Sequence, residues 1–362
     1  MKKFLLIPFL IGLATIGIIA WRFTQASTDS MGAKNANTRE HLERGMSGDP
    51  IATRNANTTD RQERRKSRVS HQKARRALSD LLGNPDRMGR AAVEALDGHL
   101  AHEQRSAQSL LAAFQISGDI ALLREAAERF PDEPSVQLEM ALQGQSPEER
   151  RKALDALRES DPENALADYL AAIDHIKQGD LESAFKDLTV AAGKPEWDSY
   201  DLSIIQARED AFLAADFSPA EAKVAGMFDL PLGYIEPIKD LSNRLFDLQN
   251  DYARSGDVEA AESVRQMGQQ LGRQIQTGNS LFFFQEFIGM STERRFLDPT
   301  TSEARIAEID QRISQFKELN NGAESSLSNT LSNMSDTEAI LYTERIKHEG
   351  EEAANQWLLD RK

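Results

Sequence analysis

Beyond residue 76, apolar residues recur at spacings of three and four, and short polar breaks interrupt the pattern. Leu110, Leu111 and Phe114 form one such group, and the breaks include Gly118-Asp119 and Asp161-Pro162. This spacing places apolar residues on one face of an α-helix, whereas a half-buried strand needs strict alternation. Gly, Pro and Asp in the breaks end helices. The sequence therefore predicts an all-α fold in which short helices pack as antiparallel neighbours.

The segment from residue 161 to residue 195 resembles a tetratricopeptide repeat. In that family a small residue on the first helix packs against a small residue on the second, and these positions are Ala172 and Ala184 here. The turn between the two helices falls at Gly179-Asp180. Alanine at both crossing points lets the helix axes approach closely. The resemblance implies a helical hairpin centred on Gly179.

Two other segments share this pattern. Tyr252, Gly256 and Ala261 reproduce the aromatic residue and the distance from the turn to the alanine. The turn at Gly118-Asp119 is less complete, because Leu123 stands where alanine is expected. The intervals between the three glycines are not multiples of one repeat length. The resemblance therefore implies an irregular α-solenoid of antiparallel helical hairpins. The residues before it predict a transmembrane helix and a disordered linker.

The resemblance to tetratricopeptide repeats covers roughly residues 105–195 and, less completely, 240–275. Asp168 and His175 depart from the family, which usually has bulky apolar or aromatic residues at these positions. Stacked hairpins of this kind form an extended concave groove that holds a peptide or a folded protein. The resemblance thus implies protein–protein interaction, and an acidic groove favours basic segments of a partner.

An uncharged block from Phe4 to Trp21 follows Met1-Lys2-Lys3. A helix of this length is about 27 Å long, close to the roughly 30 Å of a bilayer's hydrocarbon. The N-terminal lysines favour a cytoplasmic N-terminus, so the bulk of this single-pass protein is expected outside the cytoplasm, in the periplasm of a Gram-negative-type cell. The alternative is a signal peptide, cleaved near Ala26, which leaves a secreted or periplasmic soluble protein. The residues expected to span the membrane are Phe4, Leu5, Leu6, Ile7, Leu10, Ile11, Leu13, Ile16, Ile18, Ile19 and Trp21.

Charge divides the chain. Residues 1–76 hold 15 Lys/Arg against 6 Asp/Glu, and the remainder holds 28 against 52. Residues 27–60 are polar and predict a flexible linker with a reach of about 35 Å. Residues 61–76 contain eight basic residues, which form either a solvated helix start or a contact with anionic lipid. Nucleic acid is not expected, because no aromatic residue interleaves this run and the domain behind it is acidic. The residues for lipid contact are Arg61, Arg64, Arg65, Lys66 and Arg68.

The remaining divisions are the N-terminal segment 1–26, the repeats at 77–200 and a helical C-terminal region at 201–362. Within the last, residues 279–288 form the most apolar stretch after the N-terminal block, too short to span a bilayer and so a buried helix. Asn320-Asn321-Gly322 predicts a break. Ser335 to Glu338 has the signature of a capping box that starts a closing hairpin with its turn at Gly350.

The inventory of chemical motifs is mostly negative. The chain has no cysteine, which excludes disulfides, thiolate nucleophiles and cysteine zinc sites. It has no HExxH, no phosphate-binding loop and no GxSxG elbow. His99, His102 and Glu103 share one helix face and suggest a two-histidine carboxylate site, but facing ligands are needed and Arg105 opposes a cation. We expect a solvated helix face there, with no metal and no cofactor.

The architecture therefore decides the expected function. The leading hypothesis is a membrane-tethered helical-repeat scaffold that mediates protein–protein interaction in the cell envelope. The alternative is a structural envelope component whose helices serve self-association. An enzyme with a site between helices is the third reading, and the sequence offers no catalytic residues for it.

Overall fold

The computed structural model describes residues 96–227, 230, 232–279, 281–331 and 334–360, with the backbone alone described for 318–331. Within these residues the fold is all-α, and the one pairing outside helices is an isolated bridge between Asn164 and Glu196. After a helical segment at residues 96–102, the helices are α4 (Ala107–Ser117), α5 (Ile120–Arg129), α6 (Pro134–Gln143), α7 (Pro147–Ser160), α8 (Leu166–Gln178), α9 (Leu181–Gly193), α10 (Asp201–Ala214), α11 (Pro219–Met227), α12 (Ile235–Ser255), α13 (Val258–Thr277), α14 (Phe283–Phe296), α15 (Glu303–Leu331), α16 (Asp336–Glu349) and α17 (Glu351–Leu359).

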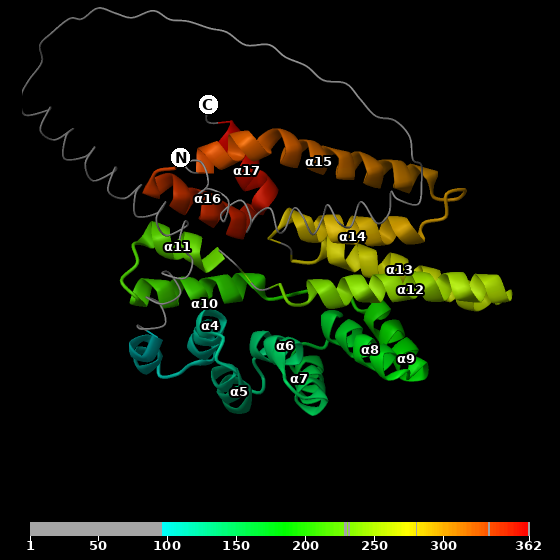
Figure 1. Cartoon of the computed structure of the whole chain (residues 1–362), viewed down its shortest axis with the longest axis horizontal. Helices are drawn as coiled ribbons and strands as arrows, with labels where there is room; N and C mark the ends of the chain where they lie inside the picture. Colours follow the sequence, from blue (N-terminus) through cyan, green and yellow to red (C-terminus); the bar gives the residue numbers. More distant parts are fainter. Residues whose placement is uncertain (1–95, 228–229, 231, 280, 332–333, 361–362) are drawn as a thin grey trace, which may run out of the picture.

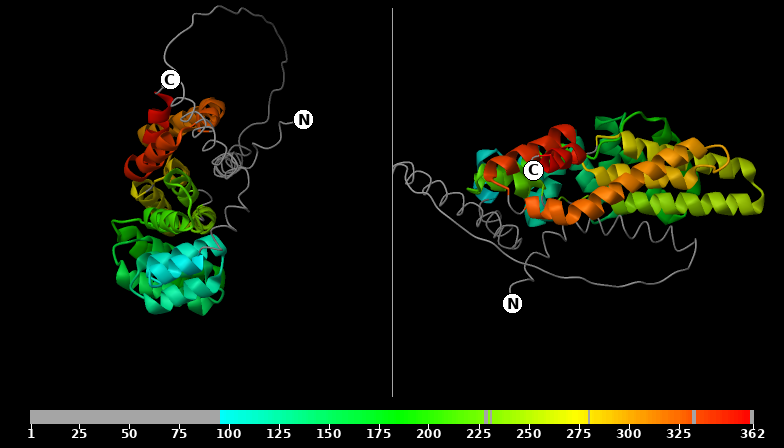
Figure 2. Two further views of the ribbon diagram at one scale, coloured as in Figure 1. Left: turned by 90° about the vertical axis from the view of Figure 1, so that its left-hand side faces the viewer. Right: turned by 90° about the horizontal axis from the view of Figure 1, so that it is seen from above.

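These helices form three layers (Figures 1 and 2). The first layer is a stack of the hairpins α4–α5, α6–α7 and α8–α9, in which α5 also packs on α6 and α7 on α8. The second layer contains α10–α11 and α12–α13, with α10 lying on α4 and α12 on α8. The third contains α14–α17, where α14 packs on α13 and α16 on α11. The main core cluster runs through the first two layers and into α14, so residues on both sides of position 200 share it.

Several helix ends in the first two layers follow from local sequence. Gly118, Gly179 and Gly256 adopt left-handed φ values of 71°, 79° and 84°, which glycine reaches without a Cβ clash. In each case the following aspartate caps the next helix, because its side chain accepts a hydrogen bond from a free backbone N–H of that helix. At α7 a capping box of Ser146 and Glu149 satisfies two such groups. The breaks expected from the sequence are confirmed at these positions.

The hairpin stack stops after α9 because the chain is turned back. The connection from α9 to α10 is fixed to the α7–α8 turn by Asn164, whose amide donates to the carbonyl of Asp198 and to the hydroxyl of Tyr200, each over 2.9 Å. Two backbone bonds reinforce it, one from the N–H of Ala165 to the carbonyl of Glu196 and one from the N–H of Glu196 to the carbonyl of Glu163. Tyr200 then takes a left-handed φ of 57° immediately before α10. As a result α10 runs back across the stack to α4 instead of adding a fourth hairpin.

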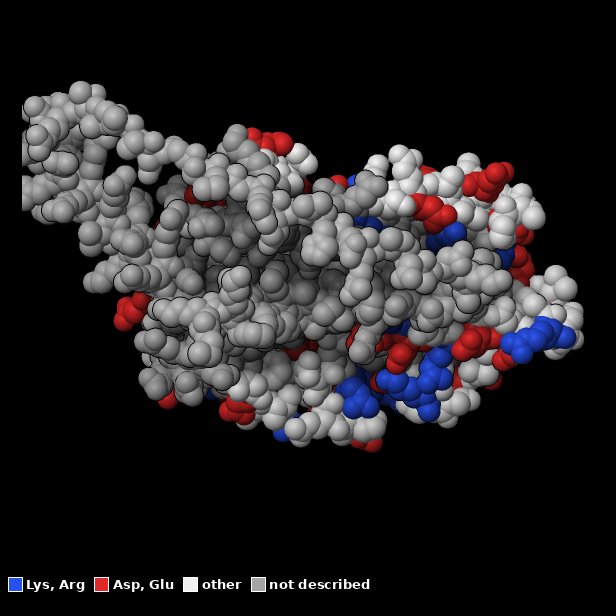
Figure 3. Space-filling view, turned by 45° about the horizontal axis from the view of Figure 1, so that its top comes forward, with Lys and Arg blue, Asp and Glu red and all other residues white. Residues whose placement is uncertain are grey.

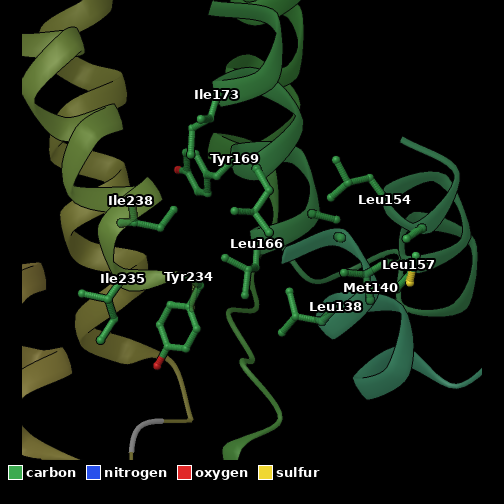
Figure 4. Packing of buried hydrophobic residues seen from close by; sticks show 14 of the residues in the cluster. Leu138, Met140, Leu154, Leu157, Leu166, Tyr169, Ile173, Tyr234, Ile235 and Ile238 are labelled. Carbon is green, nitrogen blue, oxygen red and sulfur yellow. The ribbon is translucent and has the colours of Figure 1, made fainter. Parts of the chain in front are cut away.

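The inner face of the stack, formed by α4, α6 and α8, is covered by the second layer. Figure 4 shows Tyr169 and Leu166 of α8 directed toward Ile238 and Tyr234, the latter at the start of α12. Trp197, in the connection to α10, packs its ring between Tyr169 and Tyr234, with ring centroids 5.9 and 6.5 Å away. Apolar side chains therefore fill the space that a regular solenoid leaves open as a concave groove.

The second and third layers meet at an unusually close helix crossing. A Cβ at Gly272 of α13 would lie 2.4 Å from the backbone nitrogen of Glu293 in α14, and one at Gly289 would lie 2.7 Å from the carbonyl oxygen of Gly272. Only glycine permits this approach, because even an alanine methyl clashes with the opposite backbone. The crossing encloses Glu293, while Phe283 and Phe287 of α14 pack against Phe316 of α15. The sequence expectation of a buried helix at 279–288 is confirmed for residues 283–288, because α14 begins at Phe283.

The C-terminal third agrees with the sequence except at one point. The capping box of Ser335 and Glu338 and the turn at Gly350 are present, and Leu358 docks in a small apolar cluster. The break expected at Asn320-Asn321-Gly322 is wrong, since α15 continues through it to Leu331. A glycine inside a helix costs about 1 kcal/mol relative to alanine, which weakens a helix without ending it.

None of the helices described is long and apolar enough to cross a membrane. The expected membrane-spanning residues, the linker and the basic run all lie within residues 1–95, outside the described part of the chain.

Candidate functional site

The residues that carry the tetratricopeptide resemblance lie at hairpin turns and packed positions. Gly179 and Gly256 are the left-handed C-caps of α8 and α12. Ala172 and Ala184 are buried on the two helices of the third hairpin, and Ala261 is buried on α13. Tyr252 is partly buried against the main core cluster. These residues therefore shape the scaffold, and they line no cavity described here.

The two departures from the family pattern, Asp168 and His175, belong to an ion-pair network on the hairpin stack. Asp168 is buried and receives the Nε of Arg158 from α7 at 2.7 Å and the Nζ of Lys194 at 2.5 Å. His175 lies 3.5 Å from Asp187, which also pairs with Arg158. The network ties α7, α8 and α9 together by charge where the family packs apolar side chains. It is a structural feature.

The candidate functional site is a recess at the opposite end of the stack, where α4 and α10 meet beside the helical segment 96–102 (Figure 1). Its volume is about 420 Å³, within the range of small-ligand pockets. Two layers contribute to it, since α10 crosses α4 there. The lining residues are His99, His102, Glu103, Ser106, Gln108, Ser109, Ala207, Asp210, Leu213 and Ala214.

A sharp break between two helices shapes the recess. The first helical segment ends at His102, and Gln104 and Arg105 take left-handed φ values of 53° and 52° before Ser106 caps α4. The helix face expected to carry His99, His102 and Glu103 therefore ends within this group, because the helical segment stops at His102. The break turns Arg105 toward α5, where its Nε donates to Glu125 over 2.7 Å. Arg105 is thus paired with α5 and is absent from the recess lining, so it does not oppose a cation there.

The electrostatic character of the recess is acceptor-rich. Glu103 and Asp210 contribute carboxylates, and no Lys or Arg occurs among the residues that line it. His99 is only 6% exposed, and its ring has no hydrogen-bond partner among the described residues. Burial lowers the pKa of His99 below its ordinary value, an effect that outweighs the attraction of Glu103 and Asp210. The imidazole is therefore neutral at pH 7 and keeps one nitrogen free to accept a hydrogen bond.

The sequence identified part of this site. His102 and Glu103 are exposed and hydrogen bond to each other over 2.7 Å, as expected for a solvated helix face. His99 differs because α10 covers it. Asp210 was not identified, since it lies more than a hundred residues away and only the return of α10 brings it to the recess. The described residues include no group of three or more His, Asp or Glu side chains arranged to hold a metal ion.

A second pocket of about 320 Å³ lies among α13, α14 and α15 and contains Arg305 and Arg312. Both arginines are already engaged. Arg305 bonds the buried Glu293 at 2.7 Å, and Arg312 bonds Glu286 at 3.2 Å and also pairs with Glu352. Figure 3 shows basic and acidic side chains side by side at the right-hand end of the visible face. This pocket is therefore internally neutralised and is the weaker candidate.

Comparison with protein-family models, with curated proteins and with solved structures finds no match to this chain.

Proposed function

We propose that this protein is a membrane-tethered helical scaffold of tetratricopeptide-like hairpins, an irregular α-solenoid that binds a protein partner in the cell envelope. The observation that carries the proposal is the recess between α4 and α10. It is built from two layers, its volume is that of a binding pocket, and its buried histidine and two carboxylates have no basic side chain among its lining residues.

The filled inner face determines where on the protein a partner is expected to bind. A partner cannot occupy the groove along α4, α6 and α8, because α10, α12 and the connection around Trp197 already pack there. Partner binding is therefore assigned to the open end of the stack. Residue 96, where the described part of the chain begins, also lies at this end.

The location belongs to the same proposal. Residues 4–21 would form a single-pass anchor, with the acidic body outside the cytoplasm and the basic run at 61–76 near anionic lipid. A carbonate wash of membranes followed by N-terminal sequencing tests it. Retention with an intact N-terminus is the expected result, whereas a mature protein that starts near Ser27 and washes free would exclude the anchor.

Affinity purification of the tagged full-length chain from detergent extracts tests the binding function. The expected result is one heterologous protein in stoichiometric amount, lost when Asp210 and Glu103 are replaced by Lys while far-UV circular dichroism is unchanged. Recovery of the chain alone as a self-complex would instead favour the structural alternative. A partner retained by the charge-reversed variant would move the binding surface away from the recess.

A further inference from the structure

The chemistry of the recess indicates which group a partner presents to it. Three residues that carry acceptors line it: His99 and Glu103 from residues 96–103, and Asp210 from α10. Glu103 already accepts one bond from His102, and Asp210 only a long one from Gln206 at 3.4 Å. Most of the acceptor capacity of the two carboxylates is therefore unused by the chain itself.

We propose that the recess binds the guanidinium group of an arginine side chain presented by the protein partner. This inference rests on the proposed scaffold function and specifies what the partner contributes.

Two properties of a guanidinium and one property of the recess favour this ligand. Its planar fork carries five N–H donors that point in several directions in one plane, which suits acceptors contributed by separate elements. A guanidinium is also more weakly hydrated than an ammonium, so it enters a partly enclosed site at lower cost. The apolar part of the lining consists of Ala207, Leu213 and Ala214 and matches the aliphatic stem of arginine.

The buried histidine is the feature that a solvated acidic face does not explain. The residue is only 6% exposed, it lines the recess, and its ring makes no hydrogen bond with another described residue. A donor that enters the recess can therefore bond to the free ring nitrogen. Leu213 supports the same reading, because it is 45% exposed beside the recess and offers an apolar surface to the incoming segment.

The test is calorimetric titration of the full chain in detergent micelles with three acetylated, amidated tripeptides: Gly-Arg-Gly, Gly-Lys-Gly and Gly-citrulline-Gly. Citrulline has nearly the shape of arginine without its charge. We expect the arginine peptide to bind at least about tenfold more tightly than the citrulline peptide, since a charge-assisted hydrogen bond contributes about 1.5–3 kcal/mol. The lysine peptide should fall between them.

Matched variants locate the effect. Asp210→Asn and Glu103→Gln keep the shape of each side chain and remove its charge, and each should weaken the arginine peptide about tenfold. Asp240→Asn and Glu128→Gln make the same changes at exposed positions on α12 and α5, outside the recess, and should change nothing. Thermal midpoints within a degree of the parent protein show that the variants are folded.

Three results would overturn the inference. Equal affinity for the arginine and citrulline peptides would show that the charge of the guanidinium is not recognised. If the control variants lost as much affinity for the arginine peptide as the recess variants, the peptide would bind outside the recess. A gain in affinity on replacing Arg64 and Arg65 by Gln would show that the chain's own basic run occupies the recess in place of a partner. The titration needs no partner, so a failed affinity purification would contradict the scaffold function while the peptide result stands by itself.

Discussion

The two helices of each hairpin in the first layer differ in how they are buried, and α8 and α9 illustrate the difference most clearly. In α8 every residue from Leu166 to Ile173 is buried, including Asp168. In α9 the buried residues are Ala184, Leu188 and Ala191, a single stripe at helical spacing. The same contrast separates α6, with an unbroken buried run from Ser135 to Ala141, from α7, where Ala153, Leu154 and Leu157 are buried.

This difference shows that the inner helices of the stack belong to the protein core, whereas its outer helices form a row that is exposed to solvent. The outer helices α5, α7 and α9 behave as ordinary amphipathic surface helices with one apolar stripe. The inner helices α4, α6 and α8 are enclosed by neighbours on all sides, because the second layer covers the face that a solenoid normally offers to partners. The binding surface proposed above is therefore at the end of the stack and not along its inner face.

The largest effect is expected from placing a charge on an inner helix. Ala171 of α8 is buried, so Ala171→Glu enforces either an unpaired buried carboxylate or a local opening, at a cost of about 3–5 kcal/mol. Ala121 is exposed at the start of α5, where Ala121→Glu adds a negative charge near a helix N-terminus and should change stability by less than about 0.5 kcal/mol. Urea unfolding followed by circular dichroism measures both.

A similar cost for both substitutions would contradict the distinction between inner and outer helices. Equal tolerance of both would mean that the second layer is not held on α8.

The next largest effect concerns two buried carboxyl groups under the second layer, Glu139 of α6 and Asp201 of α10. Burial raises the pKa of each to about 7. The charged groups that act on them are themselves carboxylates, Asp201 on Glu139 and Asp198 on Asp201, and both raise the pKa further. The hydroxyls of Ser199 and Tyr234, 2.7 and 3.2 Å from Asp201, offset this in part. The outer helices contain no comparably enclosed carboxyl among the described residues.

These pKa values determine how stability changes with pH. Between pH 4.5 and 7 the folded protein holds protons on Glu139 and Asp201 that the unfolded chain has released, so the contribution of this pair to stability falls as pH rises through that window and is constant above it. The loss is on the order of 3 kcal/mol for each group. Glu139→Gln with Asp201→Asn should therefore raise the thermal midpoint at pH 8 and flatten its dependence on pH, and Glu128→Gln on the exposed face of α5 serves as the control. Parallel pH profiles for the double variant and the parent would contradict the assignment.

The sequence was sufficient for the helices because their signals are local. Gly118, Gly179 and Gly256 each precede a capping aspartate, so the turns at these positions could be predicted from the sequence. The sequence of α8 also contained a signal for two-sided burial, since Leu166-Ala167-Asp168-Tyr169-Leu170-Ala171-Ala172-Ile173 is apolar on most faces. The resemblance to a solenoid predicted an open inner face instead, because the inner face of a solenoid is normally exposed.

The candidate site was harder to predict from the sequence, because its residues come from distant parts of the chain. His99 and Glu103 are close along the chain, but Asp210 joins them only because Asn164 fixes the connection after α9 and Tyr200 reverses its direction. Arg105 turns toward α5 because two consecutive residues, Gln104 and Arg105, adopt left-handed backbone conformations. Neither is a glycine, the residue that usually marks such a turn. Neither event has a local pattern in the sequence.

A smaller effect is expected from the polar link between α8 and α13. The hydroxyl of Tyr169 is buried and donates to the Oε1 of Gln274, whose amide in turn donates to the carbonyls of Ala191 and Lys194. Tyr169→Phe keeps the ring in the core and leaves the Oε1 of Gln274 unpaired, which should cost about 1–3 kcal/mol in urea unfolding. Tyr252→Phe, at a partly buried position whose hydroxyl makes no hydrogen bond with another described residue, should cost less. A smaller loss at Tyr169 than at Tyr252 would contradict the role of this bond in joining the layers.

The smallest effect is expected at the turn that joins an inner to an outer helix. Asp180 caps α9 by accepting a hydrogen bond from the backbone N–H of Ser183 over 3.1 Å, at an exposed position that the second layer does not reach. Asp180→Ala removes this cap and should cost about 1 kcal/mol, while Asp180→Asn keeps an acceptor and should cost only a few tenths. Hydrogen exchange is the sharper measurement, because a lost cap should speed exchange of the first turn of α9 and leave the enclosed amides of α8 unchanged. If exchange rises equally in both helices, the inner row is held by its hairpin turns and not by the layer above it, and the contrast between the two rows loses its explanation.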